Sequence, residues 1–289
     1  MRSSRWSNAL SILSATAALG CLAKPPTHRA SAIQAAPASL SIGRPRPALA
    51  TETSYEDSLP LLREPENSNA APGPNGLLAI VKPDPRHHPR IYVVSQSTPD
   101  SLRLLIDRYG TKPRWAPIGR RVACTVWKSR ARPWDLCIVG LDEPDTLYPL
   151  LNANAVRYRW SPDARYLAVS GTLEGGAASV LYLVDTHSGQ SRALDTLQVY
   201  SEYEMAWSPD SHLLAVSRPT RLAPSEDVNE AEIWVYDIAG QRARVNTSGG
   251  RPNRDPRWID NTRLMFTKEE RDSESRSESL VVDVTPSER

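Results

Sequence analysis

The sequence predicts an all-β protein built from copies of one small sheet, and two observations carry this prediction. A phrase recurs: Trp-Ser-Pro-Asp begins at Trp160 and again at Trp207, and weaker copies begin at Trp115 and Trp258. The spacings of 45, 47 and 51 residues between these tryptophans are typical of propeller blades. Short apolar runs separate the copies, and no stretch of comparable length shows helical periodicity. We therefore expect a β-propeller of about five four-stranded blades.

The repeated phrase is expected to build structure rather than carry chemistry. Proline fixes φ, and an aspartate can bond its own backbone two residues on, so each Pro-Asp pair favours a tight turn between strands. The large, flat tryptophan before it suits the seam between neighbouring blades. The residues with this expected structural role are Trp115, Trp160, Pro162, Asp163, Trp207, Pro209, Asp210 and Trp258.

A fifth copy of the repeat, without its tryptophan, sets the blade count. Residues 74–80 stand where the turn and the first buried strand would lie. The last copy lacks room for a final strand, so we expect residues 58–62 to pair beside 280–284 and close the ring, because open sheet edges invite aggregation. The propeller domain would then span 56–289. An incomplete propeller that closes by dimerisation is the alternative.

The repeat resembles the TolB-type, WD40-like (PD40) β-propeller repeat. The match rests on Trp-Ser-Pro-Asp followed by Leu-Ala-Val and then by Leu-x-Leu-Val-Asp. The chain has Ala164 and Ser211 where the family prefers glycine, which makes the turn less favourable. The resemblance implies a periplasmic or envelope-associated protein, because the family's known members are mostly found there. Many of them are platforms for protein partners, and others accompany peptidase domains.

The amino-terminal residues predict export and a membrane anchor. Residues 1–21 combine a positive start at Arg2 and Arg5 with a short apolar stretch, as in a signal peptide. The stretch ends at Ala-Leu-Gly-Cys, which resembles a lipobox with Cys21 as the lipidated residue. An ordinary cleaved signal near Ala23 and an uncleaved anchor are the alternatives. Residues 22–55 are rich in Pro, Ala and Ser, which predicts a disordered tether to the propeller.

The charge of the chain argues against a nucleic-acid partner, and its cysteines leave the presence of a disulfide open. The formal net charge is only +2, and no basic stripe with interleaved aromatics occurs, so a nucleic-acid partner is not expected. Cys124 and Cys137 lie on consecutive predicted strands, and export would permit a disulfide between them. Two separately buried thiols are the alternative.

The sequence contains none of the common catalytic motifs. The sequence has no Gly-x-Ser-x-Gly elbow and no glycine-rich phosphate loop, and the pair His87-His88 lacks supporting metal ligands. We therefore expect no cofactor, no metal and no enzymatic activity, but an envelope-associated platform for a protein partner. A small-ligand binder or enzyme that uses the central channel is the alternative. Because sites should lie where repeats differ, the long insertion 218–232 is the candidate contact loop, with Arg218, Arg221, Glu226 and Asp227.

Overall fold

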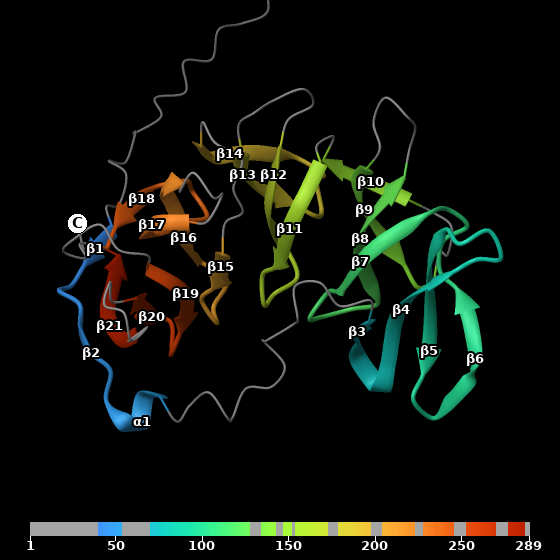
Figure 1. Cartoon of the computed structure of the whole chain (residues 1–289), viewed down its shortest axis with the longest axis horizontal. Helices are drawn as coiled ribbons and strands as arrows, with labels where there is room; N and C mark the ends of the chain where they lie inside the picture. The colour runs from blue at the N-terminus through green and yellow to red at the C-terminus, as the bar shows by residue number, and fades with distance from the viewer. Residues whose placement is uncertain are drawn as a thin grey trace, which may run out of the picture. The chain divides into compact units, whose positions relative to one another are not determined.

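Five antiparallel sheets, one for each copy of the repeat, make up the described part of the computed structural model (Figure 1). All described residues belong to one of two compact units into which the chain divides, residues 37–289. The structure describes residues 40–53, 70–127, 134–142, 147–151, 154–172, 179–197, 204–222, 228–245, 253–269 and 277–286. The predicted signal peptide with Cys21, and residues 22–39 of the predicted tether, lie outside these ranges.

Sheets 1 to 4 each contain four consecutive strands in sequence order. Sheet 1 has β3 (Ala70–Pro72), β4 (Leu77–Pro83), β5 (Pro89–Ser95) and β6 (Thr98–Leu104), with a short 3-10 turn η2 (Pro74–Gly76). Sheet 2 has β7 (Gly110–Trp115), β8 (Arg121–Trp127), β9 (Trp134–Gly140) and β10 (Leu147–Leu151). Sheet 3 has β11 (Asn154–Trp160), β12 (Tyr166–Thr172), β13 (Ser179–Asp185) and β14 (Ser191–Leu197). Sheet 4 has β15 (Glu204–Trp207), β16 (Leu213–Leu222), β17 (Val228–Asp237) and β18 (Arg242–Arg244).

Sheet 5 joins both ends of the described chain. Its consecutive strands are β19 (Asn253–Trp258), β20 (Arg263–Glu269) and β21 (Ser277–Pro286). The amino-terminal strands β1 (Leu40–Ile42) and β2 (Arg46–Pro47) pair antiparallel with the other edge of β21. A short helix, α1 (Ala50–Thr53), follows β2 (Figure 1).

These pairings correct the expected closing strand. An amino-terminal segment does complete the last sheet, but Ile42 lies opposite Val284 and Arg46 opposite Val281, so residues 58–62 cannot pair there. Residues 58–62 themselves lie outside the described part of the chain. The predicted tether is likewise corrected over residues 40–53, because the folded domain already includes them. These strands could not be recognised from composition because they are only two or three residues long. One of them also contains a proline, Pro47, which only an edge strand tolerates.

The sheets stack because each is apolar on both faces. In sheet 3, Leu167 and Val169 point toward sheet 2, whereas Ala168 points toward sheet 4, as the two buried clusters that contain them show. Side chains alternate between faces along a strand, so Leu-Ala-Val gives one large and one small face. Sheet 2 repeats the pattern with Ala123, and sheet 4 with Ala215. The small alanine face lets the next sheet approach closely.

Each repeated tryptophan joins its sheet to the one before it. The indole N–H donates to a main-chain carbonyl on the first strand of the preceding sheet in all four cases. The pairs are Trp115 to Ala71 at 3.1 Å, Trp160 to Arg114 at 3.1 Å, Trp207 to Arg159 at 3.2 Å and Trp258 to Ala206 at 3.1 Å. In sheet 1 the exposed Pro72 holds the equivalent position, opposite Leu78 in β4, and it has no such donor.

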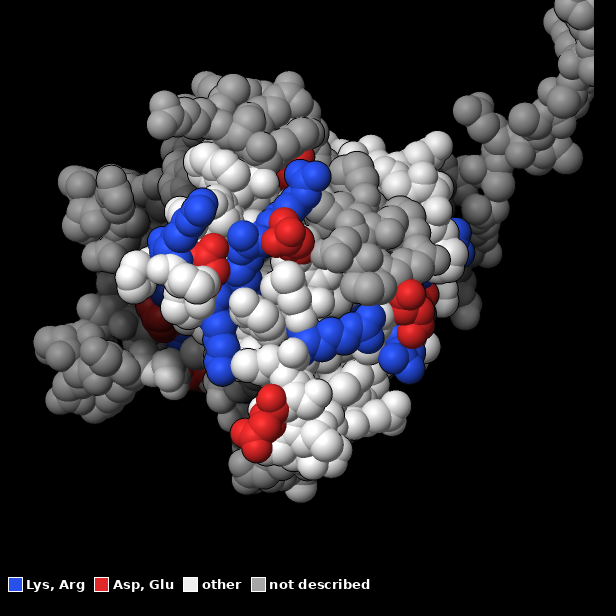
Figure 2. Space-filling view, turned by 90° about the vertical axis from the view of Figure 1, so that its right-hand side faces the viewer, with Lys and Arg blue, Asp and Glu red and all other residues white. Residues whose placement is uncertain are grey.

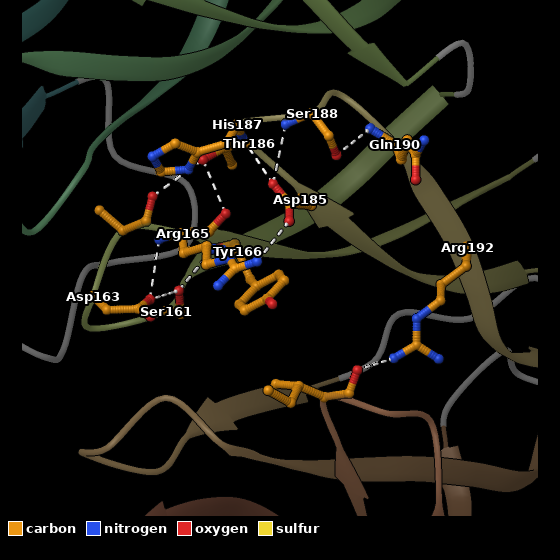
Figure 3. Close-up of polar contacts among 12 residues, drawn as sticks. Ser161, Asp163, Arg165, Tyr166, Asp185, Thr186, His187, Ser188, Gln190 and Arg192 are labelled. Carbon is orange, nitrogen blue, oxygen red and sulfur yellow. Dashed lines mark hydrogen bonds and ion pairs between the residues drawn. The ribbon is translucent and has the colours of Figure 1, made fainter. Parts of the chain in front are cut away.

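The Ser-Pro-Asp residues form a closed turn between strands (Figure 3). The Ser161 hydroxyl donates to the Asp163 carboxylate at 2.5 Å and accepts the Tyr166 N–H at 2.9 Å. The same carboxylate accepts the Arg165 N–H at 3.0 Å. Ser208 and Asp210 repeat the hydroxyl-to-carboxylate bond in sheet 4 at 2.6 Å. The Ser161 hydroxyl and one oxygen of the Asp163 carboxylate are therefore engaged within the turn.

The two positions that lack the family's glycine adopt the backbone that glycine favours. Ala164 has φ 57° and Ser211 has φ 67°, both left-handed. Ser211 gains something in return, because its hydroxyl accepts the Asp163 N–H of the neighbouring sheet at 3.0 Å. Ala164 has no side-chain group that could do the same.

The two described cysteines lie directly opposite each other in β8 and β9. Both Cys124 and Cys137 are buried as free thiols, so the structure shows the alternative of two buried thiols, and a bridge between them stays a prediction. Burial raises the pKa of the Cys124 thiol, and the neighbouring Cys137 adds to this shift. Such a thiol is a poor nucleophile.

Among the described residues, no helix has the length and apolar character needed to cross a membrane.

Candidate protein-binding site on sheets 3 and 4

The hairpin of β16 and β17 replaces most of the predicted contact loop. Both strands have ten residues, whereas their counterparts β12 and β13 have seven. Arg218 lies opposite Glu232, and Arg221 lies opposite Glu230, so the insertion 218–232 is largely strand. The register shifts after Pro219 and again after Arg221, which bends the hairpin. The predicted contact residues Glu226 and Asp227 lie outside the described residues.

Arg218 is held across the seam between sheets 3 and 4 by a buried carboxylate. Its Nε donates to Asp195 Oδ2, from β14 of sheet 3. The second oxygen, Oδ1, accepts from Arg242 of β18 at 3.2 Å. The Asp195 side chain is only 5% exposed, so its charge is compensated by the two guanidinium groups rather than by water.

The guanidinium groups of both arginines lie over the ring of Trp234. The Cζ atoms of Arg218 and Arg242 lie 5.9 Å and 5.1 Å from its ring centre, within the range of cation–π attraction. Its indole N–H donates to Glu232 at 3.0 Å, and Arg244 donates to the other oxygen of that carboxylate at 2.9 Å. We call Arg218, Trp234, Arg242 and Arg244 the arginine–tryptophan patch.

The patch combines exposure with a rigid base. The side chains of Arg242 and Arg244 are 48% and 52% exposed, whereas Asp195, which bonds Arg242, is buried. Tyr236 lies fully buried in the same strand as Trp234; burial raises the pKa of its hydroxyl, and the Asp195 charge adds to this. The tyrosine therefore stays neutral, and the positive charge of the patch belongs to the arginines.

Sheet 3 has no charged counterpart of these residues, although sheets 1 and 5 keep charge at two of the positions, with Lys82 and Arg90, and Lys268 and Glu278, where sheet 4 has Arg218 and Glu232. Strand pairing aligns the two repeats residue by residue, with Leu167 at the position of Leu214. Where sheet 4 has Arg218, Glu232, Arg242 and Arg244, sheet 3 has Gly171, Val180, Ser191 and Ala193. A scaffold position would keep the same character in both repeats, so Arg242 and Arg244, which replace Ser191 and Ala193, mark the candidate site.

Sequence reasoning identified Arg218 and missed the rest of the patch. Asp195 comes from another repeat, and nothing in its local sequence suggests a partner 23 residues away. The alternation Glu232-x-Trp234-x-Tyr236 within a strand was the available signal, because sheet 3 has Val180, Tyr182 and Val184 at these positions. Within the described ranges, no three His, Cys, Asp or Glu side chains gather as a metal site.

Comparisons with known proteins show the fold. No family model matches the chain, and neither does any curated protein. The β-propeller domain of the Trilobed protease from Pyrococcus furiosus aligns with a TM-score of 0.56 at 16% identity, over 75% of this chain and 68% of that one. Oligogalacturonate lyase from Vibrio parahaemolyticus aligns at 0.52 and 12%, over 75% and 65%. TolB from Acinetobacter baumannii aligns at 0.44 and 16%, over 74% and 54%.

The propeller predicted from the repeat is confirmed by the first of these structures, and TolB is among the structures that the chain resembles. The same comparisons correct the expectation that the chain is not an enzyme. A lyase shares this architecture, and so does the propeller domain of a protease, so missing sequence motifs do not argue against catalysis. This chain spans less than two thirds of the lyase, and no reaction is assigned to it or excluded.

Proposed function

We propose that this β-propeller is an exported protein that binds a protein partner through the arginine–tryptophan patch. The observation that carries the proposal is the patch itself: a buried carboxylate holds Arg218 and Arg242 over a tryptophan, Arg244 is exposed on the strand of Arg242, and all three arginines replace small, uncharged residues of sheet 3. Arginine and tryptophan are the residue types most enriched among interface hot spots. The side-chain guanidinium groups of Arg242 and Arg244 favour an acidic segment on the partner.

The place of action follows from the amino-terminal residues. The signal-like residues 1–21 and the lipobox-like end at Cys21 support export and attachment to a membrane through lipid. The partner would then be a protein of the cell envelope. The extended β16–β17 hairpin would meet it next to the patch.

The test compares two matched arginines. Arg244→Glu reverses charge in the patch, and Arg120→Glu does so on sheet 2, where Arg120 is 57% exposed and also pairs with a carboxylate, Asp142, at 3.4 Å. Tagged full-length variants are expressed in the native host and cross-linked, and the partners recovered with each are quantified. We expect Arg244→Glu to reduce partner recovery about tenfold or more, in line with a hot spot.

Arg120→Glu should recover partners as the unmodified chain does. Thermal unfolding of both variants confirms that they fold equally well. Equal recovery with Arg244→Glu and Arg120→Glu contradicts the proposed site. If the protein also has a catalytic activity, and that activity does not depend on the patch, it should be the same in Arg244→Glu as in the unmodified chain.

A further inference from the structure

The outer edge of sheet 4 is β18, which pairs with β17 on one side and with no described strand on the other (Figure 1). Next to it, Val245 donates its N–H to Ile233 O at 2.9 Å, so the odd-numbered residues of this segment bond β17. Main-chain groups alternate between the two sides of a strand, and the N–H and C=O groups of Arg242 and Arg244 therefore point away from β17. These two residues present an edge to which a further strand can bond.

The same two residues carry the exposed arginine side chains of the patch. Arg242 lies opposite Tyr236, and Arg244 lies opposite Trp234, so both side chains share the face that contains the Trp234 ring. Alternate residues of a strand lie roughly 6.6 Å apart. Main-chain bonding groups and positive side chains are thus presented together, at two positions with the spacing of one strand.

The charges around β18 favour an acidic ligand. The three guanidinium groups of the patch bond two carboxylates, those of Asp195 and Glu232, so one positive charge is in excess among these five groups. Arg242 and Arg244 each donate to these carboxylates through Nη1. A guanidinium group has five N–H donors, so both arginines can bond a further carboxylate without losing the first.

Positive side chains are balanced differently in sheet 1. There Arg90 lies between two carboxylates, Asp84 at 3.5 Å and Asp107 at 2.6 Å, so negative charge is in excess among these three groups. Figure 2 shows the side of the molecule on which sheet 1 lies, and Lys and Arg side chains there are interspersed with Asp and Glu. A surface of this mixed kind gives an acidic strand little advantage.

The outer edges of sheets 2 and 3 lack the combination found in β18. The outer strand of sheet 2, β10, includes Pro149, which has no N–H to donate. In β14 of sheet 3, the residues that correspond to Arg242 and Arg244 are Ser191 and Ala193. Charge on an edge strand discourages pairing with unsuitable strands. The two arginines therefore repel basic strands and disfavour apolar ones, whereas an acidic strand is attracted.

We propose that the partner adds an extended acidic segment to the outer edge of β18, with carboxylates opposite Arg242 and Arg244. The inference rests on the proposed function, because it specifies how the arginine–tryptophan patch takes its partner. The added strand is antiparallel, as β18 is to β17. Its residues opposite the two arginines are two positions apart and lie on the same face, where opposite charges attract across the pair of strands. The segment therefore has Asp or Glu at alternate positions, and main-chain bonds to β18 supply affinity.

The test titrates heptapeptides with blocked ends onto the full chain by calorimetry, with Cys21→Ser to prevent lipidation. The first peptide, Thr-Val-Glu-Val-Glu-Val-Thr, should bind with a dissociation constant on the order of 100 µM, as expected for a short, flexible ligand. The second, Thr-Val-Val-Glu-Glu-Val-Thr, has the same composition and charge. It should bind at least about fivefold more weakly, because adjacent side chains point to opposite faces of a strand.

N-methylation separates strand addition from simple charge attraction. In antiparallel pairing the main-chain N–H groups of both glutamates of the first peptide donate to β18, whereas the N–H of the valine between them points away. Methylating both glutamate nitrogens should weaken binding about tenfold or more, and methylating the nitrogen of that valine should change it less than about twofold.

Arg244→Ala should weaken binding of the first peptide about tenfold, whereas Arg120→Ala, the matched control on sheet 2, should bind it as the unmodified chain does. No binding of the first peptide up to about 2 mM overturns the proposal. So does equal binding of the two peptides, of the two methylated forms, or of the two variants. The cross-linking test with Arg244→Glu is separate. If that variant loses the partner while both methylated forms bind equally, the proposed function stands and strand addition is contradicted.

Discussion

Sheets 1 and 5 are the first and last copies of one repeat, and they present different outer faces. Sheet 5 is completed by the amino-terminal strands β1 and β2 (Figure 1). Glu52 of α1 accepts a hydrogen bond from Arg263 on the outward side of this sheet. Sheet 1 receives no such segment among the described residues, and Leu102 and Leu104 stay exposed. The position of the seam tryptophan also differs, with Trp258 in sheet 5 and Pro72 in sheet 1.

The difference shows that capping is added to a repeat from outside it. Every inner sheet buries both faces against neighbours, so the repeat itself carries two apolar faces and cannot supply a polar end. At sheet 5 the chain brings in a charged segment from 200 residues away in sequence, as the 211-residue separation of Glu52 and Arg263 shows. At sheet 1 no described segment is added in this way, because its four strands are consecutive in the chain.

The largest expected effect separates the two seam positions. Trp258→Ala removes a buried indole and leaves the Ala206 carbonyl without its donor, and should cost about 3–5 kcal/mol of unfolding free energy. Pro72→Ala, at the equivalent exposed position, should change it by less than about 0.5 kcal/mol. Denaturant unfolding followed by circular dichroism measures both. Equal losses of unfolding free energy in Trp258→Ala and Pro72→Ala would contradict the difference between sheets 5 and 1 at this position.

A smaller effect depends on pH and belongs to sheet 5 alone. The hydrogen bond from Arg46, together with the Leu49 N–H, lowers the pKa of Glu52 to about 2. An unfolded glutamate titrates near pH ~4.3, so the unfolded chain binds more protons between these values. The stabilisation from Glu52 is therefore complete above that range and is lost as the pH falls toward 2.

The measurement is the stability difference between the unmodified chain and Glu52→Gln from pH 7 to 2. Glu52→Gln should be the less stable protein at pH 7, and the gap should close as the pH falls. Asp100→Asn, which changes an exposed carboxylate of sheet 1, should leave the pH dependence nearly unaltered. A gap that stays constant down to pH 2 would mean that Glu52 does not hold its charge in the folded sheet.

The smallest expected effects lie in the turns of the repeat. Sheet 1 uses Asn75 and Gly76, with φ of 55° and 70°, where sheet 3 has Ala164 with φ of 57°. Gly76→Ala should cost about 1 kcal/mol, because a Cβ is disfavoured in the left-handed region. Ala164→Gly should gain about 0.5 kcal/mol by relieving the same penalty in sheet 3. Melting temperatures that move in the same direction for both variants would contradict this account.

Much of the fold could be predicted because its signals are local and repeated. The tryptophan spacing and the Leu-Ala-Val strands specify a sheet and its two apolar faces within about 50 residues, and each copy supports the others. The closing strand could not be found in this way. Leu40–Ile42 and Arg46–Pro47 form strands only because β21 presents an unpaired edge, and their composition is that of a linker.

The candidate site, like the fold, could be predicted from the sequence only in part. Arg218 could be predicted because the repeats differ in length at that point, and the sequence alone shows this difference. Asp195 and Arg242 join Arg218 only because sheets 3 and 4 pack face to face. By itself the sequence determined the repeat, its turns and its apolar faces, because those depend on residues close along the chain. Tertiary structure alone decided which segment completes sheet 5, which face of sheet 1 stays open and which charges meet at the patch, because these depend on contacts between residues far apart in sequence.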